Sequence, residues 1–91
     1  MFVGFYTFEL YIPHANSLKE KRNSLRSLKE RLKKLNVSFQ EEENDLWQRT
    51  LLGVAFVSET ESRLSAMFNE LTKLIEEYPE IQILNSKMEV F

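Results

Sequence analysis

Residues 2–35 read FVGFYTFELYIPHANSLKEKRNSLRSLKERLKKL, and within them a strand pattern gives way to a helix pattern. Side chains over residues 2–12 alternate between two faces, with aromatic residues prominent, which is typical of a β-strand. One face carries Tyr6, Phe8, Leu10 and Ile12, and the other carries Phe5, Thr7, Glu9 and Tyr11. Pro13 ends this strand, because proline offers no N–H to a ladder of backbone hydrogen bonds.

A helix is predicted to follow this strand. Ser17 stands three residues before Glu20, which is the spacing of a capping box, where each side chain bonds the other residue's backbone N–H. Leucines then recur at helical spacing and form one apolar stripe about five turns long. They are Leu18, Leu25, Leu28, Leu32 and Leu35. We expect Asn36 to end this helix in the left-handed conformation, which asparagine tolerates.

The predicted helix is also strongly basic. Residues 17–35 hold eight of the chain's twelve lysines and arginines against Glu20 and Glu30, so the segment carries +6 in a chain of net charge −2. Residues 1–36 sum to +5 and residues 37–91 to −7. A basic helix on an acidic domain can attract a polyanion or an acidic partner surface. It is also what an ordinary solvated helix face can look like, and the sequence leaves both interpretations open.

Two more strands are predicted after the basic helix. Residues 37–43 start the first of them, with Val37 and Phe39 facing inward. The acidic run EEEND at residues 41–45 predicts a polar turn or hairpin loop. Residues 47–57, WQRTLLGVAFV, then form a strand that is nearly apolar in both phases.

A second helix and a last strand complete the chain. Ser58 stands three residues before Glu61, which predicts a second capping box. Pro79 stops this helix. Its apolar stripe comprises Leu64, Met67, Phe68, Leu71, Leu74, Ile75 and Tyr78. Residues 81–91 alternate imperfectly, which predicts a bulge or bend near Asn85.

The predicted order is β-α-β-β-α-β, which is the ferredoxin-like arrangement of two helices on one face of a four-stranded antiparallel sheet. It is an α+β fold in which the first and third strands are central. A chain of 91 residues makes one domain, residues 1–91, with no room for a second core.

The cysteine content and the N-terminal segment indicate where in the cell the protein is located. The chain has no cysteine, so it has no disulfide and no thiolate metal site, which fits a reducing cytoplasm. The apolar N-terminal segment is too short to span a bilayer, lacks the basic start of a signal peptide, and is interrupted by Glu9. We expect a cytoplasmic protein without membrane association.

The predicted architecture leaves one face of the sheet without helices. In an antiparallel sheet with a solvated face, polar residues normally alternate with apolar ones and point outward. The third strand lacks this alternation. Large exposed apolar patches mark interfaces, so we expect a homo-oligomer, most simply a dimer, that packs through the sheet. The expected interface residues are Phe5, Thr7, Tyr11 and Trp47. A single-stranded RNA platform that stacks bases on Phe5 and Tyr11 is the competing interpretation, and Glu9 between them disfavours it.

Nothing in the sequence predicts catalysis. His14 is the only histidine and cysteine is absent, so a metal site or a nucleophile–base pair has no partners. Residues 41–45 lack the spacing and the glycine of a calcium loop. The only glycines are Gly4 and Gly53, which rules out a glycine-rich phosphate loop. We expect no catalytic residue, no metal and no cofactor.

The basic helix is the best functional candidate, because lysine and arginine need no sequence-specific geometry to contact phosphates. Arg49 could add to it or could neutralise the nearby acidic loop. Trp47 either closes the end of the sheet or serves as an exposed anchor, since tryptophan is enriched at interface hot spots. The candidate binding residues are Lys19, Lys21, Arg22, Arg26, Lys29 and Arg49.

Two stretches stand out together, IPHANSLKEKR at residues 12–22 and DLWQRTLLGVAFVS at residues 45–58. With the opening MFVGFYTFELYIP, they resemble the YlxP-like family of small bacterial proteins of unknown function over essentially the full length. The resemblance implies a ferredoxin-like fold, and it carries over no catalytic residues, because none are established for the family. Because the family's genes often lie near those for translation initiation and ribosome maturation, it also implies a translation-linked role. The chain departs from the family's pattern at His14, where glycine is common, and at Thr7 and Tyr11, where basic residues are common.

From these features we expect a non-enzymatic accessory factor that contacts the ribosome or ribosomal RNA through the basic helix, with Arg49 nearby. Reversing the charges of Lys21, Arg22 and Arg26 should then abolish binding to ribosomal particles while the fold survives. The alternative is a protein-interaction module that assembles through the open sheet face without contacting nucleic acid. Salt dependence separates the two, because phosphate contacts weaken steeply with salt and apolar contacts much less.

Overall fold

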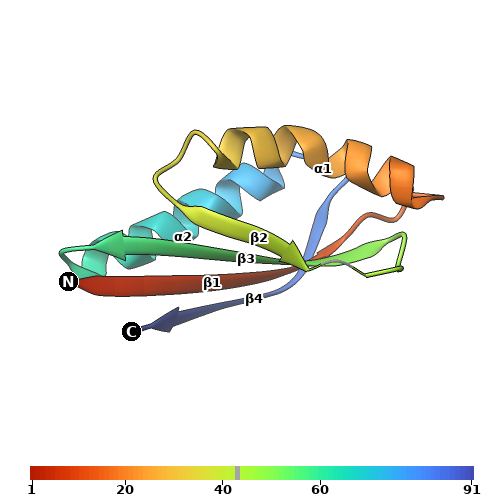
Figure 1. Ribbon diagram of the computed structural model, residues 1–91. Helices are drawn as coiled ribbons and strands as arrows, with labels where there is room; N and C mark the ends of the chain where they lie inside the picture. Colours follow the sequence, from red (N-terminus) through yellow and green to blue (C-terminus); the bar gives the residue numbers. More distant parts are fainter. Residues whose placement is uncertain (43) are drawn as a thin grey trace.

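The computed structural model describes residues 1–42 and 44–91, which form a four-stranded antiparallel sheet with two helices over one face (Figure 1). The elements in chain order are β1 (Phe2–Tyr11), α1 (Leu18–Leu32), β2 (Ser38–Glu42), β3 (Arg49–Ser58), α2 (Glu61–Glu76) and β4 (Gln82–Val90). The strands lie in the order β2-β3-β1-β4, so β1 and β3 are central. The predicted ferredoxin-like α+β fold is confirmed. Glu43, which belongs to the predicted acidic turn, lies outside the described residues.

The core lies between the helices and the sheet. Tyr6, Phe8 and Leu10 alternate inward along β1, and all three are fully buried. The rings of Tyr6 and Phe8 stack on Phe68 of α2, with ring centroids 5.7 Å apart in both pairs. The Tyr6 hydroxyl donates to the Leu64 carbonyl of α2 at 2.7 Å, so its burial leaves no donor unsatisfied. Leucines of α1 complete the core.

Helix α1 begins at the predicted N-cap, but the Glu20 side chain bonds the N–H of Asn16 instead of Ser17, and the helix ends differently from the prediction. Ser17 is the N-cap, and its hydroxyl accepts from the Glu20 N–H at 3.1 Å, while the Glu20 carboxylate accepts from the Asn16 N–H. No described non-glycine residue has a positive φ, so the prediction that Asn36 ends the helix in the left-handed conformation is wrong. Short turn bonds to carbonyls of the last helical turn end α1 after Leu32 instead.

Helix α2 does not start at the predicted capping box. Ser58 still belongs to β3, where it pairs with Phe2 of β1, and its hydroxyl accepts from the Thr60 N–H at 3.2 Å. Thr60 is the N-cap, without a side-chain cap hydrogen bond. The prediction is wrong because the strand ladder keeps the backbone of Ser58 in the sheet.

The predicted irregularity in the last strand is confirmed. Glu9 of β1 faces Asn85 of β4, whereas the next residue, Leu10, faces Ile83. Leu84 is therefore the extra residue of a β-bulge, and its side chain is exposed. The bulge explains why the apolar residues of the last strand change phase in the sequence.

Candidate functional site

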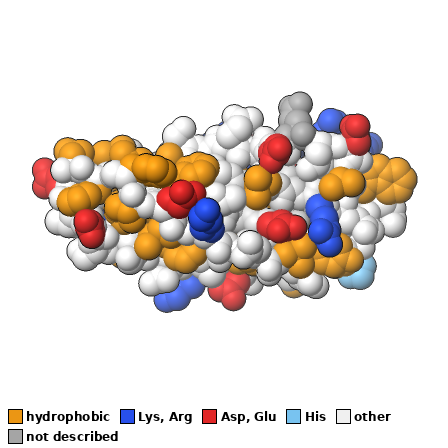
Figure 2. Space-filling view, turned by 90° about the horizontal axis from the view of Figure 1, so that it is seen from below, with side chains coloured by type: hydrophobic (Ala, Val, Ile, Leu, Met, Phe, Trp, Pro, Cys, Tyr) orange, Lys and Arg blue, Asp and Glu red, His pale blue; other side chains and the backbone are white. Residues whose placement is uncertain are grey.

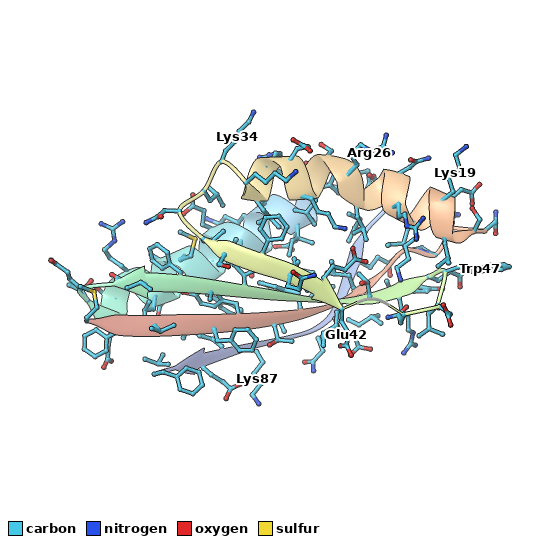
Figure 3. The ribbon with its side chains drawn as sticks, in the orientation of Figure 1. Lys19, Arg26, Lys34, Glu42, Trp47 and Lys87 are labelled. Carbon is cyan, nitrogen blue, oxygen red and sulfur yellow. The ribbon has the colours of Figure 1, made fainter. Side chains whose placement is uncertain are left out.

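One side of α1 carries a row of exposed cations. The row, called the basic face below, consists of Lys19, Arg22, Arg26 and Lys33. Spacings of three, four and seven residues place them on the same side of a helix. Figure 3 shows Lys19 and Arg26 pointing away from the sheet. Within residues 1–42 and 44–91, the first three make no ion pair, and Lys33 reaches the exposed Glu30 at 3.4 Å.

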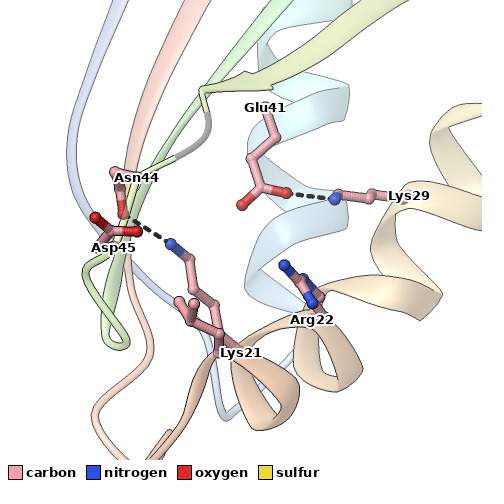
Figure 4. A pocket seen from close by; sticks show the side chains of 7 residues that line it. Lys21, Arg22, Lys29, Glu41, Asn44 and Asp45 are labelled. Carbon is pink, nitrogen blue, oxygen red and sulfur yellow. Dashed lines mark hydrogen bonds and ion pairs between the residues drawn. The ribbon is translucent and has the colours of Figure 1, made fainter.

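Two hollows run along the basic face where α1 passes the edge strand β2. The larger, of about 460 Å³, is drawn in Figure 4. Its lining residues are Leu18, Lys21, Arg22, Lys29, Glu41, Asn44 and Asp45. The smaller, of about 290 Å³, is lined by Arg22, Arg26, Lys29, Glu30, Lys33 and Phe39. Arg22 and Lys29 line both hollows, so the two hollows are parts of one groove. Five cationic and three carboxylate side chains line this groove.

Lys21 lies at this groove but is buried. It is only 4% exposed, and its Nζ donates to Asn44 Oδ1 at 3.0 Å and to the Leu46 carbonyl at 2.8 Å. Burial lowers the pKa of Lys21, and the nearby Glu41 carboxylate opposes this shift without cancelling it. Lys21 therefore ties α1 to the loop between β2 and β3. The expectation that it offers its charge to a partner on the surface does not hold, because its ammonium group is already engaged.

Lys29 is partly neutralised within the fold. Its ammonium group pairs with the Glu41 carboxylate of β2, and the Thr50 hydroxyl donates to the same carboxylate at 2.7 Å. Burial acts to raise the pKa of Glu41, but the bonds from Lys29 and Thr50 outweigh it and hold that pKa below its usual value. Lys29 keeps 34% of its side chain exposed, at the edge of the basic face. It offers a partner less charge than Arg22 or Arg26.

Arg49 does not join the helix residues. It is the first residue of β3 and lies on the open face of the sheet, where its guanidinium is 3.5 Å from the Glu9 carboxylate. Both helices cover the opposite face (Figure 1). The expected grouping of Arg49 with the basic helix is wrong, because alternation along β3 sends Arg49 and the buried Thr50 to opposite faces.

Trp47 stands exposed in the loop between β2 and β3. Its exposed fraction of 54% is too large for a side chain that closes the end of the sheet, so that alternative is wrong, and the role of an exposed anchor stays a prediction. A hollow of about 440 Å³ lies beside it. The lining residues are Tyr11, Asp45, Leu46, Trp47, Gln48 and Arg49. This hollow lies at the end of the molecule where Figure 3 also places Lys19.

Apolar side chains on the open face gather at one end of the sheet (Figure 2). The group, called the apolar end below, consists of Val3, Phe5, Val57 and Phe91. Strand register makes them neighbours, because Val3 is opposite Val57 and exchanges two backbone hydrogen bonds with Phe91. Only Phe5 was predicted as an interface residue. The outward phase of the third strand was the available signal for Val57, whereas the position of Phe91 depends on long-range pairing.

The four predicted interface residues do not form one patch. Phe5 lies in the apolar end, whereas Tyr11 lies at the far end of β1, beside the hollow that Trp47 lines. Thr7 lies between them, opposite Lys87 of β4. An interface through the open face would therefore use either the apolar end or the hollow at Trp47.

The described residues contain neither a cluster of metal-binding side chains nor a membrane-spanning helix. No group of three or more histidine, aspartate or glutamate side chains among them is placed to hold a metal ion. No helix in this part of the chain is long and apolar enough to cross a membrane. His14 is exposed in the turn after β1. The surface features that stand out are the basic face, the hollow at Trp47 and the apolar end.

Comparisons with known proteins agree with the sequence resemblance. The family model described as "Protein of unknown function (DUF503)" matches residues 3–88. The chain is also similar to the "Uncharacterized protein YlxP" of Bacillus subtilis (strain 168), with 36% identity over 91 residues that cover 98% of this chain and 99% of the relative. The resemblance to the YlxP-like family is confirmed. With both matches spanning nearly its full length, the chain belongs to the DUF503 family.

Proposed function

We propose that this protein is an accessory factor that binds structured RNA, of the kind found in ribosomal particles, through the basic face of α1. The observation that carries the proposal is a row of four cations, of which three make no ion pair among the described residues. Lysine and arginine contact phosphates without a special geometry, and each contact releases counter-ions and adds affinity. In this proposal the protein acts by binding and carries out no reaction.

The distribution of charge supports a polyanion partner over an ordinary solvated face. Two other cations of α1 are paired within the fold, since Arg31 pairs with Glu77 at 2.7 Å and lies over the Tyr78 ring, and Lys29 pairs with Glu41. The basic face keeps its charge although the chain as a whole is acidic, with net charge −2. Such segregation raises the local concentration of a polyanion at one surface.

Arg22→Glu combined with Arg26→Glu should strongly weaken binding to ribosomal subunits. The double variant removes two phosphate contacts and adds two repulsive charges, so binding at about 100 mM salt should fall by more than about tenfold. Any binding that remains should depend less steeply on salt, by roughly one unit of slope for each lost contact. Cosedimentation of the purified protein with bacterial ribosomal subunits between about 50 and 200 mM salt measures both effects.

Arg63→Glu combined with Lys73→Glu is the matched control. Both side chains are exposed on α2, outside the basic face, and the double variant has the same change in net charge. It should bind with nearly the affinity and salt dependence of the wild type. An equal loss of binding in the two double variants would mean that net charge, and not the basic face, determines binding. Full binding by the variant of Arg22 and Arg26 would contradict the proposal.

A second candidate function is self-association through the open face, and the apolar end favours it. Val57 is 55% exposed and Phe91 is 71% exposed, and contiguous exposed apolar side chains mark interaction sites on proteins. A two-fold arrangement would bury the apolar end of one copy against that of another. The apolar end and the basic face lie on opposite sides of the sheet, so both functions can coexist.

Val57→Asp should convert such a dimer to monomers. The new carboxylate would have to be buried in the middle of an apolar contact, so we expect association to weaken by more than about tenfold. Asn69→Asp introduces the same charge at an exposed position of α2, on the other side of the sheet, and should leave association unchanged. Sedimentation velocity over a range of protein concentrations measures both. A wild-type protein that sediments as a monomer throughout would remove this candidate.

A further inference from the structure

Trp47 is exposed although the backbone on both sides of it is held in place. On one side, the Leu46 carbonyl accepts from the buried Lys21 ammonium group at 2.8 Å. On the other side, Gln48 Nε2 donates to the Pro13 carbonyl at 3.1 Å. The loop therefore presents Trp47 from a backbone position held on both sides, so that little backbone freedom is lost when a ligand binds there.

The hollow beside Trp47 is open to solvent and is lined by aromatic and charged side chains. Its volume of about 440 Å³ falls within the range of about 300 to 1,000 Å³ that small-molecule sites occupy. Tyr11 and Arg49 lie next to each other at this hollow, because they are opposite residues in the ladder of β1 and β3. Aromatic rings and the guanidinium plane of arginine are the surfaces on which unpaired nucleic-acid bases stack.

Charge decides which part of a nucleic acid this hollow can take. The Asp45 carboxylate lines it and also lines the larger hollow of the groove along α1, so the two sites adjoin. A phosphate beside Asp45 would be repelled, whereas a base is uncharged and its amino group can donate to a carboxylate. The phosphates of the same strand can lie on the basic face, which reaches this end of the molecule at Lys19 (Figure 3).

We infer that the hollow lined by Tyr11, Trp47 and Arg49 holds an unpaired base of the RNA whose phosphates contact the basic face. The inference rests on the proposed function and adds to it the kind of RNA that is bound, namely one with a single-stranded segment. A continuous double helix keeps its bases stacked and paired, so it cannot fill the hollow. The base site also gives a role to the exposed Trp47, which lies at the opposite end of the sheet from the apolar end.

Trp47 is the only tryptophan in the sequence, so its fluorescence reports on this site alone. A short single-stranded oligoadenylate should quench the fluorescence as a base stacks on the indole ring. Inorganic polyphosphate carries phosphates without bases, so it should bind the basic face and leave the fluorescence unchanged. Isothermal titration calorimetry measures the binding of each ligand independently of the fluorescence.

Variants of Trp47 separate stacking from charge. Trp47→Ala should weaken oligoadenylate binding by about tenfold and leave polyphosphate binding unchanged. Trp47→Phe keeps an aromatic face and should recover most of the lost affinity. Arg22→Glu combined with Arg26→Glu should weaken the binding of both ligands. Circular dichroism checks that each variant remains folded.

The possible outcomes distinguish the base site from the basic face. Oligoadenylate that binds the wild type without quenching, and that binds Trp47→Ala equally well, would overturn the base site. The proposed function would survive that result if the variant of Arg22 and Arg26 still lost binding. Failure of both ligands to bind at low salt would overturn the base site, and failure of ribosomal subunits to bind as well would overturn the proposed function.

Discussion

Lys21→Glu should lower the free energy of unfolding by about 3 kcal/mol or more, although Lys21 belongs to the most basic helix of the protein. The Lys21 ammonium group is buried and donates to Asn44 Oδ1 and to the Leu46 carbonyl. A glutamate would lose both bonds, leave the Leu46 carbonyl without the donor it has now, and place a second carboxylate near Glu41, whose charge acts on Lys21. All three effects destabilise the folded state.

Arg22→Glu is the matched comparison, because it makes the same change of charge on the next residue, which is exposed. Surface substitutions of this kind usually change stability by less than about 0.5 kcal/mol. For a domain of this size, 1 kcal/mol corresponds to about 4–8 °C in Tm. Thermal unfolding followed by circular dichroism should therefore show a loss of more than about 10 °C for Lys21→Glu and little change for Arg22→Glu. Similar losses would contradict the structural role of Lys21.

This difference affects every test of function on α1. The sequence alone predicted that reversing Lys21, Arg22 and Arg26 together would leave the fold intact, and the burial of Lys21 argues against this. Lost binding in that triple variant would report on unfolding, or on release of the loop that carries Trp47. Charge reversal limited to Arg22 and Arg26 tests the basic face alone.

The fold was predictable because its signals are local. Alternation along β1 and helical periodicity along α1 each involve residues close together in the chain. The burial of Lys21 could also have been predicted, because Lys21 occupies a position of the apolar stripe. That stripe runs Leu18, Lys21, Leu25, Leu28 and Leu32, at spacings of three and four. The partners of Lys21 were not predictable, since Asn44 and Leu46 lie in a distant loop without periodicity.

The two serine–glutamate pairs show that a local sequence pattern alone does not determine where a helix begins. Ser17 caps α1, with the predicted bond to the Glu20 N–H. Ser58 has the same spacing from its glutamate, yet it stays in β3 because its backbone pairs with Phe2. The role of a residue at the end of a strand depends on pairing across the sheet, and sequence spacing carries no information on that pairing.

The candidate site was less predictable than the fold for the same reason. The third strand was predicted from residue 47, but β3 begins at Arg49, which leaves Trp47 in the loop. Arg49 then faces away from the basic helix and meets Tyr11 through the register of β1 and β3. These placements follow from strand register, which is determined by contacts between residues far apart in the chain.

Phe8→Ala should lower the free energy of unfolding by about 3–5 kcal/mol, which is the usual cost of truncating a buried aromatic side chain. Phe8 is fully buried in β1 and stacks on Phe68 of α2, so the substitution opens a cavity between the sheet and that helix. A domain of this size has a total stability of roughly 5–14 kcal/mol. The variant should therefore be close to unfolding at physiological temperature.

Phe5→Ala is the matched comparison, three residues earlier on the same strand. Phe5 is 38% exposed on the open face, where its ring lies over Gly53, so truncation should cost about 1 kcal/mol or less. Urea unfolding at low protein concentration, where self-association adds no stability, gives both values. Because alternation sends two identical side chains to opposite faces, we expect their costs to differ by at least about 2 kcal/mol. Equal losses would mean that both faces of β1 are buried in solution, and the open face would then be part of a permanent dimer rather than a reversible contact.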